Sequence, residues 1–286
     1  MLVNSNKILK KARESGYAVG GFNTSDLEIT EAIIWAAEKL RAPVIVQTSQ
    51  KAIGYAGLES IVCIITTLAK KAKIPVILHA DHIKEIESIQ KCIEAGYTSV
   101  MIDVSSKPYE ENLETTSRVV KLARQKGDIS VEAELGAVGG KEDYEVTKKF
   151  LTDPQKAKEF VEKTGINSLA VAIGNRHGVP IPEEKLEFDL LEKIKNTVSI
   201  PLVLHGASST PPDDIKKAIS LGISKINIDT DIRLAFKNSI KDFISNHPDV
   251  YDPREILSAS REAIQKIVEA KIKIFGSATK YESSEN

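Results

Sequence analysis

Short apolar segments rich in β-branched residues alternate along the chain with longer stretches of helical periodicity. Each apolar segment is nearly continuous, which is typical of strands buried on both faces. The segments that we interpret as strands are 18–23, 43–49, 75–81, 99–104, 129–135, 168–174, 200–206 and 225–230. The stretches between them have the period of amphipathic helices. Examples are 32–40, 60–73, 86–95 and 111–126.

Strand–helix alternation indicates parallel strands joined by crossover helices. Eight such units predict an α/β fold of the closed (β/α)8 TIM barrel type rather than an open doubly wound sheet. Glycines at 96, 127, 165 and 222 follow predicted helices, where glycine commonly ends a helix. No linker rich in Pro, Gly or Ser divides the chain. We therefore expect a single barrel domain over residues 1–286, with a C-terminal helical extension and a polar tail after Ala278.

The amino-acid composition limits the classes of partner and the cellular location that we expect for this chain. Its 286 residues are 42% hydrophobic and 28% charged, with a net charge of −1, so no basic surface is expected to bind nucleic acid. The N-terminal segment lacks the apolar core of a signal peptide, and no later run is long enough to span a membrane. Cys63 and Cys92 each lie within an apolar helical pattern, which predicts reduced, buried thiols and a cytoplasmic location.

Polar residues gather at the ends of the predicted strands, where active sites lie in this fold. The candidates at or just past these ends are Asn23, Ser49, Asp81, His82, Asp103, Glu134, His177, His205, Asn227 and Asp229. Each histidine taken singly could be a hydrogen-bonded rim residue. Three histidines at one barrel mouth instead favour a catalytic zinc site, because three neutral imidazoles leave one metal position open.

His79 lies two residues before Asp81 and therefore shares its face of the strand, pointing into the barrel. It is either a partner of a metal ligand or, more simply, a hydrogen-bonded interior histidine.

Two further features suggest substrate contacts. The turns 205–209 and 227–230 carry small residues before helices, and their N–H groups, with the hydroxyls of Ser208 and Thr230, suit a phosphate. The long loop 134–150 combines glycines with acidic residues, which predicts a lid that carries an acid or base. Its acids Glu142, Asp143 and Glu145 cannot be ranked from these physical features.

Six motifs, in order along the chain, resemble the class II, metal-dependent fructose-bisphosphate and tagatose-bisphosphate aldolases. They are LHADH (78–82), SVMID (99–103), VEAELGAVGGKED (131–143), AIGNRHG (172–178), HGAS (205–208) and KINIDTD (225–231). The similarity extends from about residue 16 to residue 275. It implies an aldehyde-lyase of glycolysis and gluconeogenesis that acts on a phosphorylated sugar, assembled as a homodimer or homotetramer.

The resemblance also implies roles for individual residues. The catalytic zinc would be bound by His82, His177 and His205, and a second divalent or a monovalent cation would lie near Asp103 and Glu134. Asp81 would handle the proton of the C4 hydroxyl, and Glu142 the proton at the dihydroxyacetone phosphate carbon. The implied substrate-binding residues are Asn23, Ser49, Gly178, Gly206, Ala207, Ser208, Asn227, Ile228, Asp229, Thr230 and Arg254, the last acting across a subunit interface.

The segment 227–236 resembles the fructose enzymes. We therefore expect reversible cleavage of fructose 1,6-bisphosphate to dihydroxyacetone phosphate and glyceraldehyde 3-phosphate. The alternative is the catalytic subunit of a tagatose-1,6-bisphosphate aldolase. Pro180 and Ile181 stand where relatives often have an aromatic residue and a lysine, and Ser209 where glycine is common. These departures bear on phosphate geometry and substrate preference.

Three other functions on the same fold fit the sequence less well. A Schiff-base aldolase needs an inward lysine near a strand's C-terminal half; the predicted strands five to seven have none, and Lys225 would open strand eight at the opposite end. A metal-dependent hydrolase would want a His-x-His pair ending strand one, where this chain has 21–23 (GFN). A non-catalytic partner subunit should have lost Asp81, Glu142 or a histidine, and this chain retains them.

Overall fold

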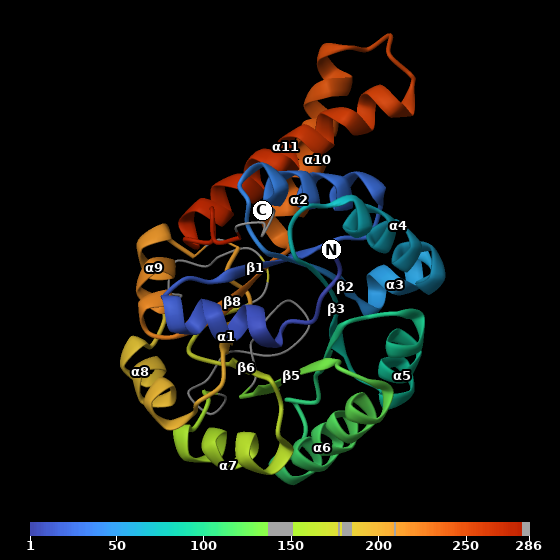
Figure 1. Ribbon diagram of the computed structural model, residues 1–286. Coiled ribbons are helices and arrows are strands. Elements are labelled where there is room, and N and C mark those ends of the chain that lie inside the picture. The colour runs from blue at the N-terminus through green and yellow to red at the C-terminus, as the bar shows by residue number, and fades with distance from the viewer. Residues whose placement is uncertain (137–150, 177, 179–184, 209, 282–286) are drawn as a thin grey trace, which may run out of the picture.

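The computed structural model describes residues 1–136, 151–176, 178, 185–208 and 210–281. Eight parallel strands close into a barrel in the order β1 to β8 (Figure 1), which confirms the predicted TIM barrel. The strands are β1 (Val19–Asn23), β2 (Val44–Ser49), β3 (Val76–Ile83), β4 (Ser99–Ile102), β5 (Ser130–Leu135), β6 (Ser168–Val171), β7 (Leu202–Leu204) and β8 (Ile223–Ile228). Each predicted segment overlaps one of these strands, because buried parallel strands carry the continuous apolar runs that the sequence displays.

Helices surround the barrel, and the main hydrophobic core lies between them and the strands. They are α1 (Asn6–Ser15), α2 (Leu27–Lys39), α3 (Gln50–Ala56), α4 (Leu58–Lys71), α5 (Ile86–Ala95), α6 (Tyr109–Lys126), α7 (Pro154–Thr164), α8 (Phe188–Thr197), α9 (Pro212–Ser220), α10 (Thr230–Asn246) and α11 (Pro253–Ile274). Gly96 and Gly165 end α5 and α7 with left-handed backbone, as predicted. Helix α9 ends at Ser220 with Leu221 as its C-cap, and Gly222 follows one residue later.

Helix α1 closes the N-terminal end of the barrel. Its Leu9 and Ala12 form a small buried cluster with Val19, Ile45 and Ile77, which lie near the beginnings of β1, β2 and β3. Figure 1 shows α1 lying across the barrel at this end. Most of the candidate functional residues that the structure describes lie at the opposite end, where the strands terminate.

Helix α11 packs along α10 and against α2, and the far ends of α10 and α11 project beyond the barrel wall (Figure 1). Among the described residues, no single helix has the length and apolarity to cross a membrane. The bent pair α3 and α4 passes that test only when its two helices, at 96° to each other, are taken together.

The two cysteines differ in environment. Cys92 is buried as predicted, and its burial raises the pKa of the thiol to about 11. The prediction was wrong for Cys63, which is exposed. Helix α4 buries Ile61, Val62 and Ile65 on its other face, so an apolar residue between them in sequence still faces solvent.

Candidate active site and metal centre

Asp81 and His82 are consecutive residues of β3, yet both of their side chains turn toward the same cluster at the barrel mouth. Consecutive strand residues ordinarily point to opposite faces. Here the register with β4 shifts between Ala80 and Ile83, and His82 has a φ of 52°. This irregularity redirects His82 toward the mouth, where its Nε2 lies 4.0 Å from Asp81 Oδ1. A left-handed non-glycine residue costs about 1–2 kcal/mol, so the surrounding fold holds strain at this position.

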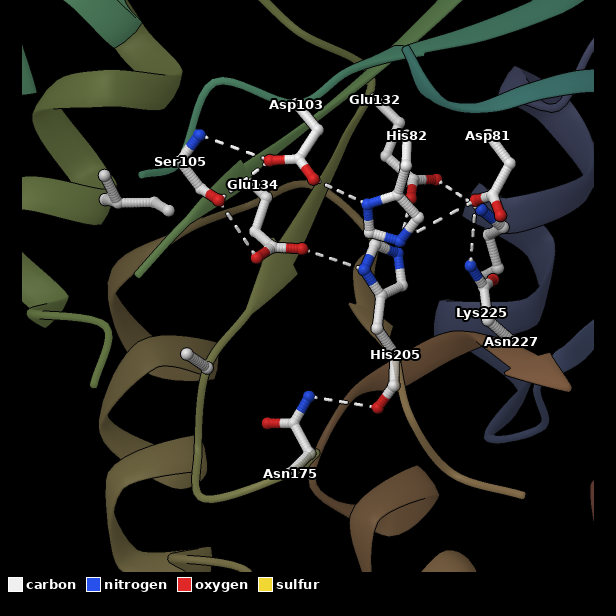
Figure 2. A network of polar contacts seen from close by, with 12 residues as sticks. Asp81, His82, Asp103, Ser105, Glu132, Glu134, Asn175, His205, Lys225 and Asn227 are labelled. Atoms are coloured by element: carbon white, nitrogen blue, oxygen red, sulfur yellow. Dashed lines mark hydrogen bonds and ion pairs between the residues drawn. The ribbon is translucent and has the colours of Figure 1, made fainter. Parts of the chain in front are cut away.

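Carboxylates from β5 and from the residue just past β4 lie beside two adjacent imidazoles (Figure 2). The rings of His82 and His205 have centroids 4.6 Å apart, at an interplanar angle of 60°. His82 Nδ1 lies 2.6 Å from Asp103 Oδ2, and His205 Nδ1 lies 2.8 Å from Glu134 Oε2. The structure thus brings together residues from β3, β5 and the ends of β4 and β7.

The carboxylates make this end of the barrel strongly favourable for positive charge. Burial alone would lower the pKa of His82, but Asp81 and Asp103 outweigh burial and raise it to about 10. Burial opposes the shift of Asp103 as well, and the bond to His82 still holds its pKa well below the ordinary value. A field that stabilises a proton on His82 would stabilise a divalent cation at the same place.

Two overlapping groups of side chains have ligand atoms close enough to share a metal ion. Asp81, His82 and His205 form one, and His82, Asp103 and Glu134 form the other, with all ligand atoms of a group within 4.8 Å of one another. Imidazole nitrogens with carboxylate oxygens are a donor set suited to zinc and related divalent metals. The described residues therefore fit a metal centre. His177, the third predicted imidazole ligand, lies outside the described residues.

Amide side chains fix the Asp81 carboxylate. Asn23 Nδ2 donates to Asp81 Oδ2 at 2.9 Å, and Asn227 Nδ2 donates to Oδ1 at 3.2 Å. Gln47 Nε2 donates to Asn23 Oδ1 at 2.8 Å, which turns the Asn23 amide group toward Asp81. Burial by itself would raise the pKa of Asp81, but His82 and Lys225 lower it below the ordinary value. Asp81 is therefore an oriented, ionised carboxylate that can accept a proton.

The predicted phosphate region joins the end of β7 to the start of α10. Ser208 Oγ accepts from the backbone N–H of Asp229 at 3.3 Å and of Asp231 at 3.5 Å. Lys271 of α11 donates to the Ser208 carbonyl at 2.6 Å and pairs with Asp231. The side chains of Ala207 and Ile228 are fully buried, so any substrate contact at these two residues would come from their backbone. The N-terminus of α10 faces this region, and helix N-termini favour anions.

Other predicted residues have different placements. Ser49 caps α3 by accepting from the N–H of Ala52. Gly178 and Gly206 both have left-handed backbone. Arg254 is the second residue of α11, which begins at the projecting tip in Figure 1; its side chain is 88% exposed and paired with Asp252, so a single chain does not bring it to the barrel mouth. Glu142, together with Pro180, Ile181 and Ser209, lies outside the described residues.

Sequence reasoning missed several polar residues that support the site. Ser105 donates its hydroxyl to Asp103 at 2.8 Å and lies 3.3 Å from Glu134. Asn175 donates to the carbonyl of His205 at 3.0 Å and so ties the β6 loop to the end of β7. Asn175 lies within a quoted motif and Ser105 directly follows the strand-four segment, but no periodicity marks either as a site residue.

The position of Lys225 in its strand was also predicted incorrectly from the sequence. The prediction that it opens strand eight was wrong, because it is the third residue of β8 and is buried inside the barrel. Its ammonium group donates to Glu132 Oε2 at 2.8 Å. Glu132, which the candidate set omitted, is equally buried.

A parallel barrel that gathers imidazoles and carboxylates at its strand ends defines the class: a TIM-barrel enzyme with a site for a divalent metal. The family model described as fructose-bisphosphate aldolase class-II matches residues 3–280. The chain belongs to this family of metal-dependent aldolases, and it is therefore a carbon–carbon lyase.

Individual relatives agree with this assignment. The chain is 44% identical over 281 residues to a probable fructose-bisphosphate aldolase of Bacillus subtilis (strain 168), covering 97% of this chain and 98% of that one. It is 44% identical over 283 residues to the fructose-bisphosphate aldolase of Staphylococcus aureus (strain N315), with 98% and 99% covered. Among solved structures, the YdjI aldolase of Escherichia coli K12 superposes with a TM-score of 0.88 at 36% identity, with 99% and 100% covered.

Proposed function

We propose that the chain cleaves fructose 1,6-bisphosphate reversibly to dihydroxyacetone phosphate and glyceraldehyde 3-phosphate, with zinc held by His82, His177 and His205. The observation that carries the proposal is the convergence of two imidazoles and three carboxylates at the strand ends, in a chain whose curated relatives bear the fructose enzyme's name. The third imidazole, His177, enters through its predicted place just past the sixth strand and through the sequence resemblance. The chemistry that zinc supplies when bound is Lewis-acid stabilisation of the negative charge that develops on the ketone half.

In this proposal Asp81 removes the C4 hydroxyl proton as the C3–C4 bond breaks. Both of its oxygens accept hydrogen bonds from amide groups, so the carboxylate is held in one orientation. The remaining acceptor capacity of each oxygen is available to a hydroxyl donor. Asn23 and Asn227 thus act by orienting Asp81 in addition to any contact with the sugar.

Asp103 and Glu134 are proposed to hold a second divalent or a monovalent cation. Their carboxylates lie beside His82 and are bridged by the Ser105 hydroxyl, which supports a shared oxygen-rich position. The ketone-side phosphate is proposed to lie between Gly206–Ser208 and Asn227–Thr230. The backbone N–H groups at the start of α10 support an anion there.

Arg254 is proposed to reach a phosphate in a neighbouring subunit, as part of a homodimer or homotetramer. Its side chain is 88% exposed, and α11 begins at the tip that projects beyond the barrel wall, which supports this. We also propose a cytoplasmic location and a single domain over the whole chain.

The substrate is tested by a coupled assay that compares cleavage of fructose and tagatose bisphosphates, with and without chelator. We expect the larger kcat/KM with the fructose sugar, and loss of both activities with chelator. The two sugars differ only at the C4 stereocentre, so the comparison isolates the group that Asp81 is proposed to deprotonate. A larger kcat/KM for the tagatose sugar would identify the alternative substrate and contradict this proposal.

The lid acid is tested by the substitution Glu142→Ala. We expect exchange of the dihydroxyacetone phosphate C–H proton with solvent to slow by about 10²- to 10⁴-fold, the usual contribution of a general acid or base. Binding of dihydroxyacetone phosphate should change far less. Asp143→Ala is the matched control, one residue away with the same type of carboxylate. If Asp143→Ala slowed the exchange and Glu142→Ala did not, the assignment would shift by one residue.

A further inference from the structure

A buried ion pair lies inside the barrel, next to the candidate metal ligands. The side chains of Lys225 and Glu132 are 1% and 2% exposed, and their charged atoms are 2.8 Å apart. Lys225 can extend here because Gly21 on neighbouring β1 has no side chain; a Cβ there would lie 3.2 Å from Lys225 Cε. A buried charge is tolerated only with a partner, so the two residues depend on each other.

His79 completes the surroundings of the lysine without adding charge. Its Nε2 lies 3.2 Å from Lys225 Nζ, and an ammonium group can only donate. Nε2 therefore accepts, and Nδ1 carries the proton and donates to Ser99 Oγ at 2.7 Å. Burial and the nearby Lys225 lower the pKa of His79 to about 3. Of the two bases beside Lys225, only Glu132 supplies a compensating negative charge.

The pair is connected directly to His205. Glu132 uses Oε2 for Lys225, and its other oxygen, Oε1, lies 3.0 Å from His205 Nε2. The opposite nitrogen of the ring, Nδ1, lies 2.8 Å from Glu134, which belongs to a candidate metal group with His82 and Asp103. The two edges of the imidazole thus differ: Nδ1 faces the metal cluster, and Nε2 faces the ion pair.

We propose that Lys225 is a positioning residue that acts through Glu132 on His205. By holding the Glu132 carboxylate in place, it keeps Nε2 of His205 as a hydrogen-bond donor and leaves Nδ1 to face the metal. A histidine ligand commonly donates its second nitrogen to a carboxylate, which fixes its tautomer and ring orientation. The inference rests on the metal-binding role of His205 in the proposed function.

The test is the substitution Lys225→Met, which keeps an unbranched side chain, one atom shorter, and removes its charge. We expect the affinity for Zn²⁺, measured by competition with a chromophoric chelator, to fall about 10- to 100-fold. The visible absorption spectrum of the Co²⁺-substituted protein should also change, because it reports the geometry of the ligands. Native affinity together with a native Co²⁺ spectrum would overturn the proposal, whatever the thermal stability of the variant.

Because Lys225→Met leaves Glu132 buried without its cation, the variant can fail to fold. The double variant Lys225→Met/Glu132→Met removes both charges, and replacing a buried pair by apolar residues is often neutral for stability. We expect it to fold and to show the same loss of metal affinity; native affinity in the double variant would likewise overturn the proposal. The control is Arg261→Met, which removes the pair between Arg261 and Glu31 at 2.7 Å, outside the barrel. It should leave metal affinity unchanged.

Failure of this inference is distinguishable from failure of the proposed function. If the unmodified protein binds stoichiometric zinc and cleaves the sugar, while Lys225→Met matches it in metal affinity and spectrum, only the role of Lys225 is wrong. If the unmodified protein binds no stoichiometric zinc, the proposed metal site itself is wrong.

Discussion

Removal of the divalent metal with a chelator is expected to lower cleavage of fructose 1,6-bisphosphate by about a thousandfold or more. A Lewis acid contributes several kcal/mol to such a transition state, and each 1.36 kcal/mol corresponds to a factor of ten in rate. Added Zn²⁺ or Co²⁺ should restore activity, because imidazole and carboxylate donors accept both ions. Metal content and initial rate should be measured on the same samples.

Two controls separate loss of metal from loss of fold. The chelator presaturated with Zn²⁺ should leave the rate unchanged, and circular dichroism should show an intact barrel in the stripped protein. The fold is expected to survive because the hydrophobic core between strands and helices does not include the metal ligands. Full activity after exhaustive removal of metal would contradict the proposed chemistry.

Asp81→Ala is expected to reduce cleavage by about 10²- to 10⁴-fold while metal stoichiometry stays the same. The substitution removes the carboxylate that Asn23 and Asn227 orient, and with it the acceptor for the hydroxyl proton. The measurements are kcat for cleavage and bound zinc per chain. A suitable control is Asp213→Ala, because this carboxylate is 93% exposed and is paired with Lys216 on the same helix, α9.

The structure also allows a second role for Asp81, that of a metal ligand. Its carboxylate lies close enough to His82 and His205 to share a metal ion with them. If Asp81→Ala lost its zinc together with its activity, Asp81 would belong to the ligand set, and the proton acceptor would have to be another group.

The closed barrel was predictable because its signal is local and repeated. Each strand is a short apolar run, and each intervening helix has its own period, so the eight units could be recognised independently. The strand ends followed from the same pattern. Asp103 and Glu134 were therefore both expected at the barrel mouth although they come from different strands, since parallel strands place their C-terminal ends at one edge.

The irregularity in β3 was not predictable in the same way. Regular alternation would send the side chains of Asp81 and His82 to opposite faces, and both were nonetheless expected at the mouth from their position at the strand end. What brings them there is a register shift with β4 and a left-handed residue at His82. Such a conformation is unfavourable locally and persists only because neighbouring strands enforce it.

The amino-acid sequence by itself determined the barrel, its mouth and most of the candidate side chains at the strand ends, because hydrophobic periodicity and strand ends are properties of neighbouring residues. Only the tertiary structure decided which groups meet inside: Lys225 with Glu132, Glu132 with His205, and Gln47 with Asn23. Each pair joins residues of different strands or strand ends, from 24 to 93 residues apart in sequence. These contacts form only when the barrel closes in the correct register, because closure and register fix the distances between the side chains. A local sequence pattern contains no information on those distances.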